Sequence, residues 1–120
     1  MNALEFQNRT KAMAVRVIRL TEALPNTRSA DVIGRQLLRS ATSTAANYRA
    51  ACTAKSKHDM INKLRIVQEE ADETMFWLEL IIDTNTLPLE RINDLRGEVQ
   101  QILKMTIASI NTLSRNTKPR

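Results

Sequence analysis

Apolar side chains recur at intervals of four and three residues along most of this chain, a spacing that favours long amphipathic helices. One run shows the alternation without a slip: Met60, Leu64, Val67, Ala71, Thr74, Leu78 and Ile81. Because a helix completes a turn about every 3.6 residues, these side chains share one face. Ser56 and Asp59 form a weak relative of the capping box just before the run. We therefore predict a helix over about residues 56–83.

Three further segments show the same alternation. Their stripes are, in chain order, Phe6, Thr10, Met13, Val17, Leu20 and Leu24; Ile33, Leu37, Ser40, Thr44, Asn47 and Ala51; and Ile92, Leu95, Val99, Ile102, Thr106 and Leu113. We predict helices over about residues 8–24, 29–54 and 88–114. Ser29 suits the cap of the second of these, and Pro88 suits the first turn of the last.

Turn-forming residues are scarce, which argues against most β architectures. Two glycines and three prolines in 120 residues are too few for a sandwich, a barrel or a glycine-rich phosphate loop. Short connections between long helices make neighbours antiparallel. We predict a single all-α domain over residues 1–120, an antiparallel up-down-up-down four-helix bundle. Gly97 lies inside the last helix, where we favour simple tolerance of the glycine over a close helix crossing.

The chain carries more apolar surface than one bundle of this kind buries. Residues 40–54 contain a single charge, Arg49, and residues 75–82 are apolar at every position except Glu79. Exposed together, such side chains form a patch typical of a subunit or partner surface. The alternative is that loops and the terminal arm cover them. We predict homo-oligomerisation through interface side chains that include Tyr48, Phe76, Trp77 and Leu80.

Charge is divided unevenly along the chain. Residues 1–65 carry twelve Lys and Arg against four Asp and Glu, whereas residues 66–98 carry two against nine. A basic surface of the first two helices and the following turn binds phosphate backbones without reading sequence. Its candidate residues are Arg9, Arg16, Arg19, Arg35, Arg39, Arg49, Lys55 and Lys57. The alternative is that Arg39 and its neighbours pair with acids of the third helix, which are Glu69, Glu70, Asp72, Glu73 and Glu79.

The sequence lacks the residues that common catalytic and metal sites need. His58 is the only histidine and Cys52 the only cysteine, so no Ser-His-Asp, Cys-His or zinc set can be assembled. Glu69 and Glu73 have the spacing of carboxylate-bridged metal bundles but lack the Glu-x-x-His partner. We expect no enzyme activity, no metal and no cofactor. With neither a secretory signal nor an apolar run of about 18 residues, we expect a cytoplasmic protein without membrane contact.

A motif in the second predicted helix resembles a known family. Residues 36–47 read Gln-Leu-Leu-Arg-Ser-Ala-Thr-Ser-Thr-Ala-Ala-Asn, preceded by Leu24-Pro25 and followed by the helix that carries Glu73. This arrangement resembles the 23S ribosomal-RNA intervening-sequence proteins, a bacterial family of four-helix bundle proteins. That family is similar to the accessory variability protein of diversity-generating retroelements. The resemblance implies a ring-like homopentamer, and the retroelement relatives bind nucleic acid and partner a reverse transcriptase.

The resemblance also assigns the family's recurrent polar residues. By motif position they are Arg39, Ser43, Asn47 and Glu73, which we interpret as fixing the bundle, with an ion pair between Arg39 and Glu73. The chain departs from the family where Tyr48-Arg49-Ala50-Ala51 replaces the common Ile-Ala-Glu-Gly. Because the turn-making glycine is missing, we expect the second helix to run about one turn further.

These observations lead to two hypotheses about function. The first is a non-enzymatic, cytoplasmic homopentamer that binds RNA or DNA phosphates through its basic residues. The alternative is an oligomeric scaffold or adaptor that binds a protein partner, for example a reverse transcriptase, without contacting nucleic acid.

Overall fold

The computed structural model describes residues 1–117, and all secondary structure in that range is helical. The four helices are α1 (Ala3–Glu22), α2 (Arg28–Ala51), α3 (Lys57–Asp83) and α4 (Leu89–Thr117). The apolar periodicity therefore predicted the fold class and the number of helices correctly. The bounds differ mainly at the start of α1, which begins before the predicted residue 8, and at the end of α2.

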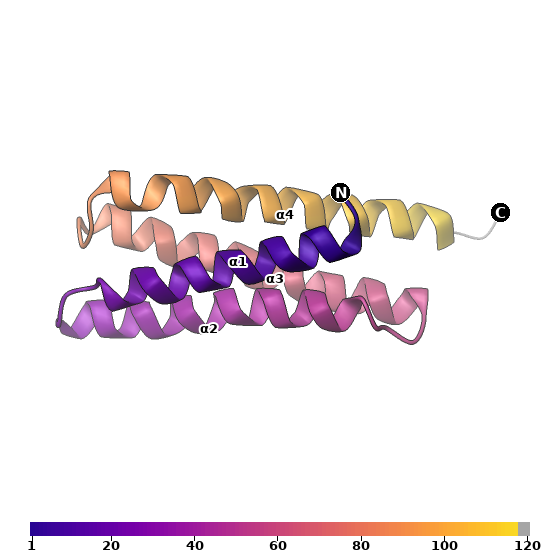
Figure 1. Ribbon diagram of the computed structural model, residues 1–120, viewed down its shortest axis with the longest axis horizontal. Helices are drawn as coiled ribbons and strands as arrows, with labels where there is room; N and C mark the ends of the chain where they lie inside the picture. Colours follow the sequence, from indigo (N-terminus) through magenta and orange to yellow (C-terminus); the bar gives the residue numbers. More distant parts are fainter. Residues whose placement is uncertain (118–120) are drawn as a thin grey trace.

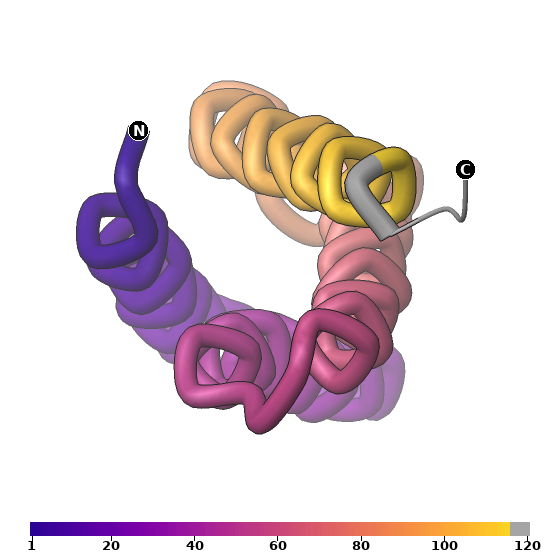
Figure 2. The backbone as a smooth tube through the Cα atoms, turned by 90° about the vertical axis from the view of Figure 1, so that its right-hand side faces the viewer, coloured from indigo at the N-terminus to yellow at the C-terminus, as the bar shows by residue number. Residues whose placement is uncertain are grey.

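The four helices form a rod of 55 × 23 × 20 Å, and Figure 1 shows the chain reversing its direction after each helix. The connections α1–α2 and α3–α4 lie at one end of the rod. The α2–α3 connection lies at the other end, which we call the α2–α3 end, together with the N-terminus of α1 and the C-terminal part of α4 (Figure 1). Seen end-on, the helices follow one another around the core, and the backbones of α1 and α4 stand apart from each other (Figure 2). These two helices also make the sparsest contacts of any neighbouring pair.

Side-chain caps start three of the helices, and the side-chain oxygen of Asn2 caps α1 by accepting from the amide of Glu5 at 2.8 Å. Ser56 caps α3 as predicted, because its hydroxyl accepts a hydrogen bond from the amide of Asp59 at 3.0 Å. The cap of α2 is Thr27 rather than Ser29, and its hydroxyl accepts from the amide of Ala30 at 3.2 Å. Thr27 has the extended backbone that a cap requires, whereas Ser29 already lies inside the helix.

The predicted extra turn of α2 does not form. The helix ends at Ala51, and the amides of Thr53 and Ala54 bond to carbonyls three residues back. This tightens the chain, as is common at helix termini. Ser56 must then be extended to cap α3, which leaves no room for a longer α2.

The core follows the predicted stripes with two slips, and in the first of them Ile61 is buried at the start of α3 where Met60 was predicted. In α2 the inner position of the penultimate turn is held by Tyr48, which is 7% exposed, and the neighbouring Asn47 is only half-buried. The spacing allows both readings, since the sequence Leu37, Ala41, Thr44, Tyr48, Ala51 also alternates four and three. Tyr48 occupies the inner position because its ring packs edge-on against Phe6 of α1, with ring centroids 4.5 Å apart.

Hydroxyl side chains are built into this core. Thr10, Ser40, Thr44, Thr74 and Thr106 are buried, and each bonds to a carbonyl about one turn back in its own helix. The hydroxyls of Ser40 and Thr74 also lie 2.9 Å apart and join α2 to α3. Among the described side chains no buried polar atom lacks a partner. Burial of these groups is therefore inexpensive.

Candidate nucleic-acid interface

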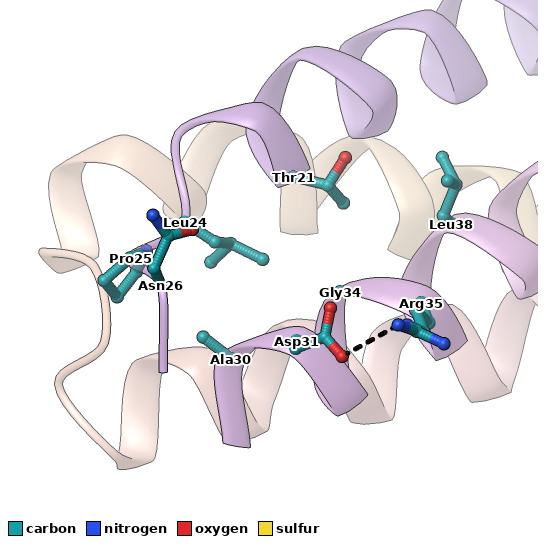
Figure 3. A pocket seen from close by; sticks show the side chains of 9 residues that line it. All are labelled: Thr21, Leu24, Pro25, Asn26, Ala30, Asp31, Gly34, Arg35 and Leu38. Atoms are coloured by element: carbon teal, nitrogen blue, oxygen red, sulfur yellow. Dashed lines mark ion pairs between the residues drawn. The ribbon is translucent and has the colours of Figure 1, made fainter. Parts of the chain in front are cut away.

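Arg35, Arg39 and Arg49 lie on the exposed side of α2, as their spacing predicted. Arg35 forms an ion pair with Asp31 one turn earlier, at 3.2 Å, beside a pocket of about 230 Å³ at the α1–α2 connection (Figure 3). Exposed pairs of this spacing contribute little to stability, on the order of 0.3–0.5 kcal/mol. Arg35 is nevertheless partly neutralised and is a weaker phosphate ligand than its exposure suggests.

Arg39 is the centre of a polar cluster that joins α2 to α3. Its guanidinium pairs with Glu70 at 3.0 Å and with Glu73, and it donates to the side chain of Gln36 at 3.1 Å. The predicted Arg39–Glu73 ion pair is thus confirmed. The indole of Trp77 donates to the same Glu73 carboxylate at 3.0 Å. We call Gln36, Arg39, Glu70, Glu73 and Trp77 the Arg39 cluster.

The pKa values in the Arg39 cluster follow its hydrogen bonds. The bond from Trp77 lowers the pKa of Glu73 below its ordinary value, and the guanidinium of Arg39 lowers it further, while partial burial opposes both effects. The bond to Glu73 raises the pKa of Arg39. Both groups are therefore held in their charged forms, and Arg39 is committed to α3.

The arginines of α1 face α4 rather than the basic side of α2. Arg9 forms a two-pronged pair with Glu98, at 2.7 and 2.8 Å, and Arg16 pairs with Asp94 at 2.7 Å. The hydrogen bond to Glu98 raises the pKa of Arg9, an effect that partial burial opposes. These pairs bridge the sparse α1–α4 side of the rod. Arg19 has no acidic partner within 4 Å among the described side chains.

The remaining candidates lie at the α2–α3 end. Arg49 belongs to the last turn of α2, Lys55 to the connection, and Lys57 to the first turn of α3. None of these three side chains forms an ion pair with another described residue. The nearby Asp59 pairs instead with Lys63, at 2.8 Å, and accepts from the backbone amide of Lys55, which together lower its pKa.

The eight predicted basic residues therefore lie in different surroundings. Arg9 and Arg16 pair with acids of α4, and Arg35 and Arg39 are paired on the outside of α2. Arg49, Lys55 and Lys57 at the α2–α3 end, and Arg19 toward the other end, form no ion pair with any residue that the structure describes. Pairing with third-helix acids, the alternative raised by the sequence, holds for Arg39 alone. Sequence reasoning missed the acids of α4, although Asp94 and Glu98 are spaced four residues apart and flank the apolar stripe of that helix.

The predicted interface residues differ in how far their side chains are exposed. Tyr48 is wrong as an interface residue, because its ring is enclosed by the core against Phe6. Trp77 and Leu80 are half-buried and pack on the core cluster. Phe76 remains 49% exposed, and its ring stands edge-on to Trp77 with centroids 4.9 Å apart. It is the one predicted interface aromatic that lies mainly on the surface.

Two of the recurrent polar residues, Ser43 and Asn47, bond within α2 and to no other helix among residues 1–115, whose side chains the structure describes. The amide of Asn47 donates to the carbonyl and to the hydroxyl of Ser43, at 2.9 and 3.0 Å. Asn47 therefore does not fix the register between helices as a buried amide would. That link is made by Arg39 with Glu73 and, beneath them, by Ser40 with Thr74.

The histidine and the cysteine of the chain lie outside the Arg39 cluster. His58 is exposed in the first turn of α3, and Cys52 is a half-buried free thiol at the end of α2. Burial, and to a lesser degree Cys52, raises the pKa of Tyr48 to about 12. Within the described residues, no group of three His, Cys, Asp or Glu side chains is placed to hold a metal ion. No helix found there is long and apolar enough to span a bilayer.

Over residues 1–117 the chain is an all-helical protein of four long helices. Three of its cations, Arg49, Lys55 and Lys57, form no ion pair with another described residue and lie at the α2–α3 end of the rod. The chain belongs to the 23S rRNA-intervening sequence protein family, whose sequence model matches residues 2–108. A protein of unknown function from the S23 ribosomal protein family of Bacteroides thetaiotaomicron has a similar crystal structure, with a TM-score of 0.82 and 38% identity. The similarity covers 88% of this chain and 97% of that chain. No curated protein matches. The family resemblance in the sequence is thereby confirmed.

Proposed function

We propose that this protein is a non-enzymatic, cytoplasmic homopentamer of up-down-up-down bundles that binds the phosphates of RNA or DNA. The observation that carries the proposal is a group of three cations at the α2–α3 end, Arg49, Lys55 and Lys57, which form no ion pair with another described residue. Arg115, in the last turn of α4, lies at the same end of the rod (Figure 1). We call these four residues the basic end.

The basic end supports phosphate binding through its charge and through its repetition. Cations that are not already paired release counterions from a nucleic acid when they bind it, which drives binding that is independent of sequence. One such end holds few charges. In a ring of five chains the ends are repeated on one particle, so that weak contacts to one strand act together. The net charge of +5 per chain favours the same class of partner.

The test is a salt titration of binding to a generic duplex. The double variant Lys55→Gln, Lys57→Gln should bind more weakly and should lower the slope of log K against log salt by roughly 0.9 for each phosphate that is no longer neutralised. The matched control, Lys11→Gln with Lys104→Gln, removes two exposed lysines from the sides of the rod and should leave most of the affinity intact. No binding by the unaltered protein at low salt, or an equal loss in both double variants, would refute the proposal.

A second candidate function is a scaffold that binds a protein partner. The exposed Phe76, edge-on to Trp77, supports it, because aromatic side chains are enriched at the centres of protein interfaces. The two functions separate in the same experiment. If nucleic acid is the ligand, Phe76→Ser should keep salt-dependent duplex binding, weakened only by loss of the repeated basic ends. If a protein is the ligand, the same variant should abolish partner capture.

A further inference from the structure

Three arginines meet at the end of the rod opposite the basic end. Arg16 and Arg19 of α1 and Arg91 of α4 line one shallow pocket of about 170 Å³, whose floor is formed by Leu20 and Leu95. Both leucines are buried, whereas the three arginines are exposed, so their guanidinium groups are accessible to a ligand from solvent.

The register of the two helices sets like charges opposite one another. The Arg16–Asp94 ion pair fixes α1 against α4, and the two helices run in opposite directions (Figure 1). Arg19 follows Arg16 by three residues, and Arg91 precedes Asp94 by three residues. In antiparallel helices these two steps lead toward the same end of the rod. Arg19 and Arg91 therefore lie at a similar level of the two helices and line the same pocket, and neither has an acidic partner within 4 Å in the described part of the chain. Without a bound anion this arrangement is repulsive.

The place of Arg91 in its helix adds to the excess of positive charge. It lies in the first turn of α4, where the helix macrodipole is positive and disfavours a cation. The pocket thus carries three guanidinium groups, and Asp94 is the only acid among the described residues that pairs with any of them. The surplus of about two positive charges matches the charge of about −1.5 to −2 on a phosphate monoester at neutral pH, whereas a backbone phosphodiester carries about one negative charge.

We propose that this pocket is a binding site for a phosphate monoester group, which bridges Arg19 and Arg91. The planar guanidinium fork donates parallel hydrogen bonds that fit phosphate oxygens. Such a group can come from the 5′ end of a nucleic acid or from a small phosphorylated molecule, and both offer the same terminal oxygens. The site is separate from the basic end, so it does not depend on the function proposed above.

The first test uses inorganic phosphate as the probe. Phosphate should raise the melting temperature of the full-length protein above that in sodium chloride of equal ionic strength. The double variant Arg19→Gln, Arg91→Gln should bind phosphate at least about tenfold more weakly and lose this difference. In chloride it should be no less stable than the unaltered protein, because it removes a repulsion. Arg28→Gln with Arg65→Gln, two exposed arginines without ion pairs to other described residues, is the control that keeps the phosphate effect.

The second test identifies the source of the phosphate. A short single strand with a 5′-phosphate is compared with the same strand carrying a 5′-hydroxyl. Tighter binding of the phosphorylated strand, abolished in Arg19→Gln, Arg91→Gln, assigns the site to nucleic-acid ends; equal binding together with a phosphate-dependent melting temperature assigns it to small phosphorylated molecules. Equal stabilisation by chloride and phosphate, or an undiminished phosphate effect in the double variant, would overturn the site. The double variant Lys55→Gln, Lys57→Gln, which should bind duplex more weakly, should keep the same rise of melting temperature in phosphate.

Discussion

Gly34 and Gly97 both lie inside helices, yet they have opposite surroundings. A Cβ atom at Gly34 would come within 2.9 Å of Leu24 Cδ1, because α2 passes close to the α1–α2 connection there (Figure 3). A Cβ atom at Gly97 would meet nothing within 4 Å. The interpretation of Gly97 as a tolerated residue is confirmed. The close approach lies at Gly34, where the sequence offered no distinguishing sign.

The two glycines make a matched pair of substitutions. Gly97→Ala should stabilise the protein by about 1 kcal/mol, the usual difference in helix propensity, or roughly 3–6 °C in melting temperature. Gly34→Ala gains the same propensity but must shift the end of the Leu24 side chain, which is partly buried against the core, so its gain should be smaller or absent. Chemical denaturation of both variants measures the difference. An alanine at position 34 that stabilises as much as one at 97 would contradict this explanation.

At the level of elements, α2 and α3 are joined by two polar links at different depths. The Arg39 cluster lies at the surface, and the Ser40–Thr74 contact lies beneath it in the core. The α1–α4 contact is of another kind, since the Arg9–Glu98 and Arg16–Asp94 ion pairs bridge helices that otherwise touch little. Surface ion pairs are weak and are screened by salt. We infer that the α1–α4 side is the less stable half of the bundle.

The Arg39–Glu73 ion pair between α2 and α3 should make the free energy of unfolding depend on pH in the acid range. The pKa of Glu73 is lower in the folded protein than the ordinary value of about 4.3 in an unfolded chain. Its contribution to stability is therefore complete above that ordinary value and is lost as the pH falls through the lower, folded value. Glu73→Gln should flatten the fall of unfolding free energy between about pH 5 and 3, measured by denaturation across that range. Glu79→Gln, an exposed acid on the same helix, is the control and should leave the slope unchanged.

For the whole molecule, the proposed homopentamer requires a surface through which copies of the chain associate. A rod 23 Å by 20 Å in cross-section leaves several large apolar side chains exposed, among them Phe76 and Leu89, each at 49%. Phe76 is part of an aromatic pair on α3, whereas Leu89 stands at the start of α4. An aromatic pair next to an arginine is the better candidate for a subunit contact.

Substitution of these two residues tests the assembly. The unaltered protein should sediment at about five times the chain mass of 13.6 kDa. Phe76→Ser should lower that mass with little loss of helicity, because the side chain is half outside the core, and Leu89→Ser should not change it. Analytical ultracentrifugation at micromolar concentration makes the comparison. A single-copy species for the unaltered protein would contradict the oligomer, and an unchanged mass for Phe76→Ser would exclude this interface.

The sequence by itself determined the number of helices, the inner face of each and the cap at Ser56. These features follow from spacing over a few residues, and helical periodicity and capping are local properties of the chain. The Arg39–Glu73 pair was also within reach, through the family motif. The exchange of Asn47 for Tyr48 on the inner face of α2 was not, because two registers fit the spacing and only the presence of Phe6 on another helix selects one.

Only the tertiary structure decided which cations are free. Each arginine beside an apolar stripe can turn toward either neighbouring helix, and the rotation of α1 toward α4 gives Arg9 to Glu98 and Arg16 to Asp94. The same register sets Arg19 against Arg91, two residues far apart in the chain. Charge pairing between helices depends on their relative rotation and offset, which are set by packing of the whole core. Composition and periodicity therefore predicted a basic bundle, and the packing divided its charge between the α2–α3 end and the arginine pocket.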